Sequence, residues 1–146
     1  NNIDIGDYQE AIIQSAQLFE LWLINAYILI SKANGIDEST AEQEITKPNG
    51  DYFHPYNIFD KINSNFGYDF ESSNEFDQWE KFTKEIRNNI IHSGYEPLRS
   101  EACEAYEASM SAIYKIQEDF KQEIKQTTLV NVTQRPLSGS NILFEK

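Results

Sequence analysis

Three stretches of this 146-residue chain carry apolar residues in steps of three and four, the spacing of one face of an α-helix. They run from Asp7 to about Lys32, from Ser72 to Ser93-Gly94, and from Ser100 to Lys125. A single helix cannot bury such a stripe alone, so the three must pack together, and short connections favour antiparallel neighbours. The sequence therefore predicts an all-α fold, an antiparallel helical bundle of three long helices plus short ones.

Capping and turn residues predict where the helices begin and end in the rest of the chain. Ser72 with Glu75 three residues later resembles a capping box, and Ser100 is placed to cap the third helix. Between the first two long helices we expect a short helix that ends in a turn at Lys47–Gly50, then a helix from Pro55 to Gly67.

The helical pattern stops after Lys125. Residues 127–133 are rich in β-branched side chains, which favours a short strand, and residues 134–140 are turn-like. We therefore divide the chain into a helical domain, residues 1–126, and an irregular or short-strand C-terminal tail, residues 127–146. Since the chain begins at Asn1 without Met, we expect it to be processed or part of a longer protein, in which a fused or partner domain carries part of the function.

The charge is strongly one-sided, with 24 acidic against 12 basic side chains and a net charge of −12. Such a surface repels phosphates over about one Debye length, roughly 8 Å at physiological salt. This excludes a protein that coats nucleic acids or anionic membranes non-specifically, but it leaves room for a local phosphate site.

Cysteine usage and hydropathy narrow the setting. The single Cys103, which we expect to be buried, cannot form an internal disulfide, and one Cys with two His is too few for a zinc site of those ligands. We expect no metal, no cofactor and a cytoplasmic location. The apolar run Leu18–Ile30 contains Glu20 and is shorter than the roughly 20 residues of a membrane span, which favours a core helix.

The second long helix carries the polar residues of most interest. Asn88 and His92 are four residues apart and share a face, and the long side chain of Arg87 is able to reach the same spot. Ile91 falls inside this polar arc, where a monomer would expose it, so we expect a partner surface there. Lys81 and Lys84 add positive charge to the same side of the helix.

The segment Glu85–His92, with Asn directly after Arg87 and His five positions after it, resembles the R-x4-H motif of the HEPN superfamily of all-α domains. The resemblance covers roughly residues 7–125. It implies a metal-independent endoribonuclease, assembled as a homodimer in which two such helices face each other across a shared cleft.

The residue types suit that chemistry. Attack of a 2′-OH on its phosphodiester needs a proton-transfer group, and His92 is of the residue type suited to that role. It also needs a group that binds the phosphate, for which Arg87 offers paired donors. Asn88 would orient the phosphate or His92, and Lys84 and Tyr95 would touch the nucleotide. One imidazole cannot easily be acid and base together, so two copies of His92 in a dimer joined near Ile91 would divide those roles.

Other interpretations stay open. Arg87 and His92 also fit a surface ion pair and a helix-terminal histidine. We expect Glu20 at the rim of the cleft and His54 as a loop residue at a helix entry. At the level of function, the first hypothesis is a site-restricted, salt-dependent RNA-cleaving domain of a toxin or antiviral defence system. The alternatives are a non-catalytic dimerisation or nucleotide-binding module of a larger protein and an all-α adaptor.

Overall fold

The computed structural model describes residues 5–124. Its elements in chain order are α1 (Ile5–Ala33), α2 (Glu38–Glu44), α3 (Pro55–Phe66), the 3-10 turn η1 (Phe70–Ser72), α4 (Asn74–Trp79), the π-helical turn η2 (Glu80–Lys84), α5 (Glu85–Ser93) and α6 (Arg99–Asp119). Within these residues the only β pairing is an isolated bridge between Thr46 and Tyr52. The predicted all-α class is confirmed.

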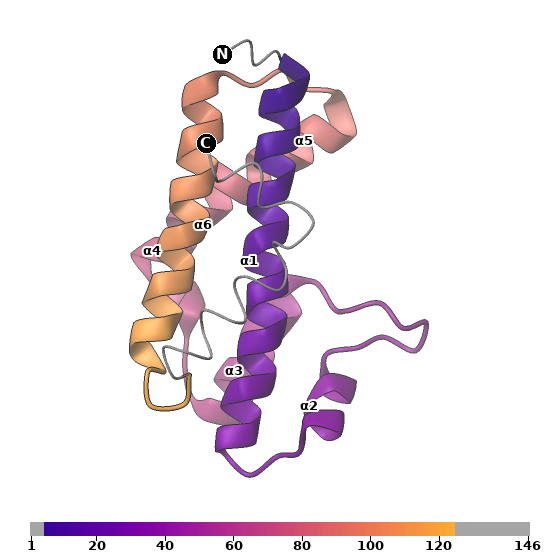
Figure 1. The fold of residues 1–146 in the computed structure, drawn as a ribbon, viewed down its shortest axis with the longest axis vertical. Helices are drawn as coiled ribbons and strands as arrows, with labels where there is room; N and C mark the ends of the chain where they lie inside the picture. The colour runs from indigo at the N-terminus through magenta and orange to yellow at the C-terminus, as the bar shows by residue number, and fades with distance from the viewer. Residues whose placement is uncertain (1–4, 125–146) are drawn as a thin grey trace.

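The long helices form the body of the molecule. α4, η2 and α5 follow one another without a break and make one helix with a π-helical turn in its middle. This composite helix packs against both α1 and α6, which lie side by side and run in the same direction, opposite to that of the composite helix (Figure 1). Successive long helices are therefore antiparallel, as predicted.

Small residues line the contact between α1 and α6. Ala105, Ala108 and Ala112 of α6 are buried, as is Ala16 of α1, and short side chains let two helices approach closely. At this contact the Ser109 hydroxyl of α6 donates to a main-chain carbonyl of α1, that of Ser15, at 2.9 Å. The bond satisfies a polar group that burial would otherwise leave unpaired.

Aromatic side chains fill the other end of the core. Phe19 of α1, Phe59 of α3, Phe70 of η1, Phe76 of α4 and Trp79 of α4 are all buried. Their rings contact one another with centroids 5.1 to 6.3 Å apart, in tilted, stacked and edge-on arrangements. Because large rings bury much apolar surface, this cluster binds the short helix α3 to the long ones.

The helix starts differ from two predictions. The N-cap of α4 is Ser73 and not Ser72, since the Ser73 hydroxyl accepts a hydrogen bond from the Phe76 amide at 3.0 Å. The N-cap of α6 is Leu98 and not Ser100, because the Glu101 carboxylate accepts the Leu98 N–H at 2.8 Å and starts the helix two residues earlier. In both places the N-cap lies one or two residues from the predicted position, because a neighbouring side chain binds a main-chain amide at the start of the helix.

The remaining helix boundaries agree well with the pattern. Pro55 opens α3, and Gly67 ends it with a left-handed φ of 70° that glycine adopts without strain. α6 ends at Asp119, although Phe120 and Ile124 of the predicted stripe are still buried in the turn that follows. The predicted tail, its strand and the domain boundary at residue 126 lie outside the described residues.

Two further expectations concern burial. Cys103 is exposed and not buried, because it lies off the apolar stripe of α6. α1 is long and apolar enough to cross a membrane by length and composition, tests that the core helix of a soluble protein also passes. More than half of its most apolar stretch is buried inside the fold, which fits the core-helix interpretation.

Candidate functional site

The π-helical turn η2 decides which way the motif residues face. A π turn carries an extra residue relative to an α turn, and one residue corresponds to about 100° of rotation. Before the turn, Trp79 points into the aromatic core; after it, Ile90 joins a separate small cluster with Ile12 and Ala105. Inside the turn, the buried Thr83 hydroxyl donates to the Ala105 carbonyl of α6 at 2.9 Å. A straight helical wheel does not predict this change of neighbours.

Arg87 is directed toward α1 and away from solvent. Its Nη1 lies 3.1 Å from Oε2 of Glu20, and the two side chains are only 14% and 25% exposed. Its Nε–H is buried and has no hydrogen-bond partner among residues 5–124. Glu20, expected at the rim, is therefore the direct ionic partner of the motif arginine.

His92 and Asn88 lie on a different side of α5. Five residues at about 100° each place His92 roughly 140° around the helix axis from Arg87. His92 is exposed in the last turn of α5, which ends at Gly94, and Asn88 is half-buried. Across the described region no hydrogen bond or ion pair joins these two residues to Arg87. The structure thus keeps Asn88 and His92 on one side and takes Arg87 away from them.

Ile91 stands beside this exposed part of α5. It is 56% exposed, as the wheel predicts, and it is one of the most exposed large apolar side chains in residues 5–124. Leu98, at the start of α6 after a short connection, is exposed as well. The end of α5 therefore presents apolar surface next to His92.

The two predicted nucleotide contacts already have partners within the chain. The Lys84 Nζ lies 5.1 Å from the centroid of the Tyr56 ring. The Tyr95 hydroxyl donates to the Glu101 carboxylate, and this hydrogen bond raises the pKa of Tyr95. The main-chain carbonyl of Tyr95 accepts a hydrogen bond from the Gln9 side chain at 2.8 Å. Tyr95 thus ties the α5–α6 connection to both neighbouring helices.

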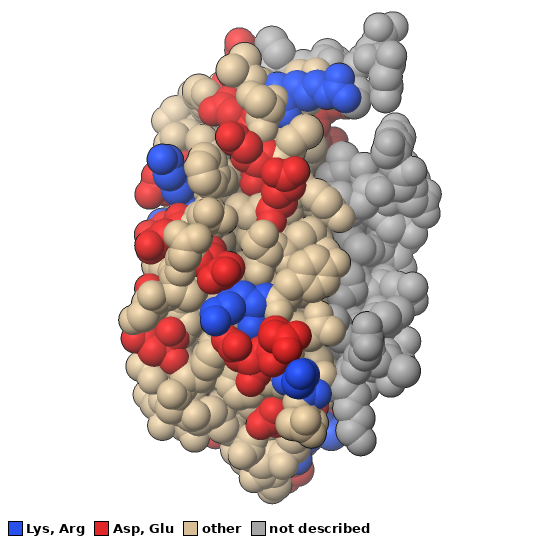
Figure 2. Space-filling view, turned by 90° about the vertical axis from the view of Figure 1, so that its left-hand side faces the viewer, with Lys and Arg blue, Asp and Glu red and all other residues tan. Residues whose placement is uncertain are grey.

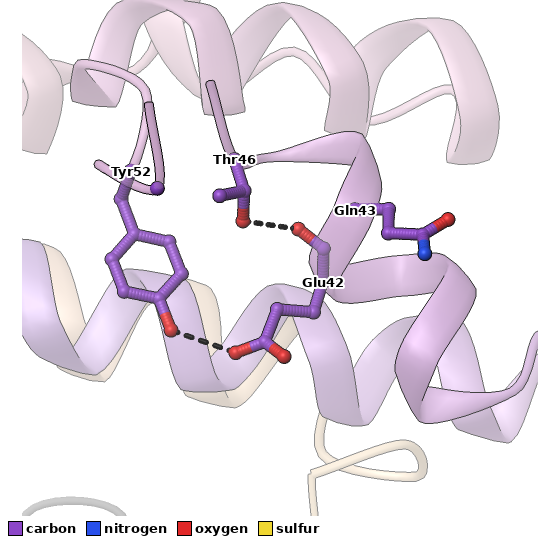
Figure 3. A pocket seen from close by; sticks show the side chains of 5 residues that line it. Glu42, Gln43, Thr46 and Tyr52 are labelled. Carbon is purple, nitrogen blue, oxygen red and sulfur yellow. Dashed lines mark hydrogen bonds between the residues drawn. The ribbon is translucent and has the colours of Figure 1, made fainter. Parts of the chain in front are cut away.

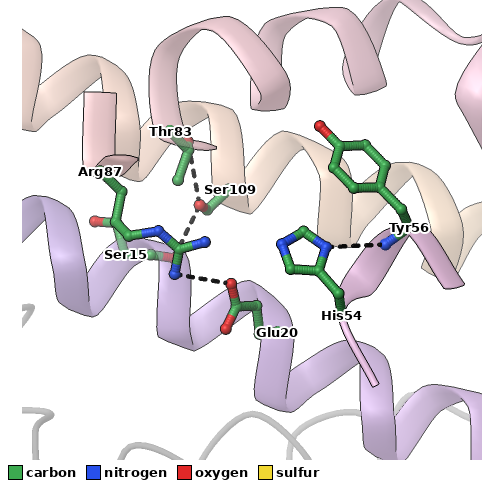
Figure 4. A network of polar contacts seen from close by, with 7 residues as sticks. All are labelled: Ser15, Glu20, His54, Tyr56, Thr83, Arg87 and Ser109. Carbon is green, nitrogen blue, oxygen red and sulfur yellow. Dashed lines mark hydrogen bonds and ion pairs between the residues drawn. The ribbon is translucent and has the colours of Figure 1, made fainter. Parts of the chain in front are cut away.

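His54 completes the surroundings of Arg87. As expected, it stands at a helix entry: it is the N-cap of α3, its Nδ1 accepts the Tyr56 amide at 3.5 Å, and its ring stacks on that of Tyr56. The other side of the imidazole faces Glu20 and Arg87 (Figure 4). Residues from α1, α3 and α5 therefore meet in one polar group.

The electrostatics of this group follow from its burial. Burial raises the pKa of Glu20, against the opposing attraction of Arg87. Burial also lowers the pKa of His54, and the positive charges of Arg87, Lys84 and Lys47 act in the same direction. His54 is thus favoured in its neutral form.

Sequence reasoning placed Glu20 and His54 outside the site. A signal existed for Glu20, since a carboxylate inside the apolar stripe of α1 needs a partner once it is buried. No pattern pointed to His54, because its approach to Arg87 depends on how α3 packs against the long helices. Among residues 5–124 there is no group of three or more His, Cys, Asp or Glu side chains that could hold a metal ion.

A shallow pocket lies elsewhere, between α2 and the turn that follows it (Figure 3). The Tyr52 hydroxyl donates to the Glu42 carboxylate at 2.8 Å, and the Thr46 hydroxyl donates to the Glu42 main-chain carbonyl at 2.5 Å. Gln43 and Gly50 complete its wall. None of the predicted site residues takes part, so this pocket is separate from the motif.

The surface charge agrees with the composition. On the face in Figure 2, lysine and arginine side chains stand singly among carboxylates and form no continuous basic area. No protein-family model, curated protein or solved structure matches this chain.

Proposed function

We propose that this chain is a metal-independent endoribonuclease domain of the HEPN type, which acts as a homodimer joined at the exposed end of α5. The proposal rests on the resemblance of Arg87–His92 to the R-x4-H motif and on the chemistry of those residue types. The observation that carries it is the exposed His92 beside the exposed Ile91 at the end of α5. A titratable group next to uncovered apolar surface suits a site that a second copy completes.

The proposed reaction breaks one phosphodiester bond. His92 of one protomer takes the proton of a ribose 2′-OH, whose oxygen attacks the adjacent phosphorus. The P–O5′ bond breaks, and His92 of the partner subunit donates a proton to the leaving 5′-oxygen. The products are a 2′,3′-cyclic phosphate and a free 5′-OH, and the two histidines account for both proton transfers.

Arg87 would stabilise the charge that develops on the phosphate. A guanidinium has five N–H donors, and the ion pair with Glu20 leaves part of them unused, including the buried Nε–H. Glu20 would then hold Arg87 in one orientation until the phosphate arrives. Asn88, on the His92 side of α5, would orient the phosphate or the imidazole.

Cleavage of a fluorescent single-stranded RNA in the presence of EDTA tests this proposal. We expect wild-type protein to cut it, and His92→Ala and Arg87→Ala to lower the rate by at least about 100-fold, the usual contribution of a general acid or base. Lys81→Ala is the matched control, because it also removes one positive charge from the same helix. The Lys81 side chain lies over the Phe82 ring in the neighbouring turn η2. Intact RNA with wild-type protein, or equal cleavage by His92→Ala, would contradict the proposal.

A second candidate function is a non-catalytic dimerisation or nucleotide-binding module of the same superfamily. The observation in its favour is that Glu20 already neutralises Arg87, which is only 14% exposed. Such a module would dimerise through Ile91 but leave RNA uncut. Sedimentation of wild-type and Ile91→Glu protein, combined with the cleavage assay, separates the two functions, and a monomeric wild-type protein would argue against both.

A further inference from the structure

Two cations of the composite helix, Lys84 and Arg87, lie close enough to His54, at the start of α3, for their charges to act on it. Arg87 contributes a buried Nε–H without a partner among the described residues. Lys84 lies three positions before it, one helical turn away. His54 reaches the same place from the start of α3, with its ring directed at Arg87 and Glu20 (Figure 4).

One hydrogen bond of His54 determines which of its ring nitrogens carries the proton. Its Nδ1 accepts the Tyr56 amide, so a neutral imidazole carries its proton on Nε2, the nitrogen that faces the cluster. The neutral form is favoured, because burial and the nearby cations lower the pKa of His54. His54 therefore offers an N–H donor and not a proton acceptor to this space.

Besides Glu20, three carboxylates act on Tyr56, the ring beside Lys84 and His54: those of Glu80, Glu71 and Glu85. Glu20 pairs with Arg87, and Glu80 accepts the Tyr56 hydroxyl at 2.5 Å. Glu85, whose charge also reaches Tyr56, is exposed on the outer side of the helix. The carboxylate of Glu20 thus occupies the place beside the Arg87 guanidinium that another anion would take, and it does so at the cost of desolvation, since burial raises its pKa.

We propose that His54, Lys84 and Arg87 form a binding site for a phosphate group, in which the Glu20 carboxylate is the internal anion that the ligand displaces. Phosphate presents several oxygens that accept from guanidinium, ammonium and imidazole donors at once. His54 is only partly buried and keeps an exposed surface, so the cluster is open to solvent on the α3 side. This site shares Arg87 with the proposed ribonuclease but lies on the opposite side of α5 from His92 and needs no cleavage.

Phosphate groups reach such a site from two sources, a free phosphate monoester or a nucleic-acid phosphodiester. Titration of the full chain at low salt, followed by NMR of the Arg87 Nε–H and the His54 ring, distinguishes them. The probes are inorganic phosphate, adenosine monophosphate, and a 2′-deoxy dinucleotide that cannot be cleaved. If the protein binds the monoester and does not respond to the dinucleotide, the natural ligand is a free phosphate monoester. If it binds the dinucleotide, the natural ligand is a nucleic-acid phosphodiester.

The variants separate this site from its surroundings. His54→Asn keeps a residue that caps α3 well but removes the imidazole, and we expect about tenfold weaker phosphate binding, as for loss of one hydrogen bond to a charged group. Lys84→Ala should weaken binding similarly, whereas Lys81→Ala, the same charge change on the same turn, should not. Glu20→Gln should strengthen binding several-fold, because the competing carboxylate charge is removed.

The site would be ruled out by equal phosphate affinity of wild-type and His54→Asn protein, or by equal losses in Lys84→Ala and Lys81→Ala. The ribonuclease proposal fails separately. A protein that leaves RNA intact but binds phosphate through His54 contradicts only the ribonuclease. A protein that cleaves RNA while His54→Asn binds phosphate normally contradicts only this site.

Discussion

The two halves of the composite helix differ sharply on either side of η2. The α4 half sends Phe76 and Trp79 into a large aromatic cluster, with rings packed from three other elements. The α5 half buries little apolar surface, with Ile90 in a small cluster beside Ile12, and carries the charged and exposed residues. The α4 half therefore stabilises the fold through buried rings, and the α5 half carries the polar residues of the candidate site.

The difference shows how one helix serves two purposes. Because the π turn shifts the helical phase, Arg87 faces α1, although Phe76 and Trp79 before the turn face the aromatic core. The large rings packed on the α4 side stabilise the composite helix, so the short α5 segment is held in place although it buries little apolar surface. Four predictions test this division, from the largest expected effect to the smallest.

Truncation of the aromatic half should cost the most. Trp79 is fully buried and contacts Phe19, Tyr56, Phe59 and Phe76, so Trp79→Ala should lower the free energy of unfolding by about 3–5 kcal/mol. Urea denaturation followed by circular dichroism measures it. Ile90→Val, in the α5 half, should cost only about 0.5–1.5 kcal/mol. Equal losses would remove the contrast between the halves.

The ion pair of the α5 half should come next. Glu20→Gln leaves the mostly buried Arg87 charge without its counter-ion, so we expect a loss of about 1–3 kcal/mol in the free energy of unfolding. The double variant Glu20→Gln, Arg87→Met should regain part of that loss, because no buried charge remains. A Glu20→Gln protein as stable as wild type in urea denaturation would mean that the pair contributes nothing.

A smaller effect should appear at Tyr27 of α1, where the large core cluster that holds the α4 half meets α2. Burial and the hydrogen bond to Glu44 raise the pKa of Tyr27 to about 12. The native state therefore holds this proton more tightly than the unfolded chain, and stability is complete below about pH 10 and falls as the pH rises toward 12. At pH 11 the loss should be about 1 kcal/mol. The difference between the urea midpoints at pH 8 and 11 should be smaller in Tyr27→Phe, but it should not vanish, because the pKa values of Tyr56 and Tyr68 are raised as well. An unchanged pH dependence would contradict this assignment.

The surface of the α5 half should affect assembly more than folding. Ile91→Glu places a charge on an exposed side chain, so the free energy of unfolding of the monomer should change by less than about 0.5 kcal/mol. Sedimentation should nevertheless show that the proposed homodimer dissociates. Leu21→Glu, at another exposed apolar position, is the matched control. A similar loss of the dimer in both variants would place the interface elsewhere.

Much of the fold was predictable from local patterns. The start of α3 at Pro55 and its end at Gly67 follow from backbone preferences that act within a few residues, and the extent of α1 follows from its apolar stripe. Cap positions were less certain, as Ser73 and Leu98 show, because several polar groups compete for the same free amides.

The candidate site was only partly predictable for a similar reason. The exposure of Ile91 follows from its place on the helical wheel. The direction of Arg87 does not, because it depends on a π turn that no residue pattern announced and on a carboxylate 67 positions earlier in the chain. His54 lies beside Arg87 because aromatic contacts, such as Phe59 with Phe19 and Tyr56 with Trp79, pack α3 against the long helices.

By itself, the sequence determined the helical class, the long helices and the residue types available on α5, because helical periodicity and turn preferences are properties of neighbouring residues. Only the tertiary structure decided that Arg87 pairs with Glu20 and faces His54, while His92 stays on the outside. Those choices depend on packing between helices and on the burial of charge, and a buried carboxylate and guanidinium stabilise each other only where the whole fold brings them together.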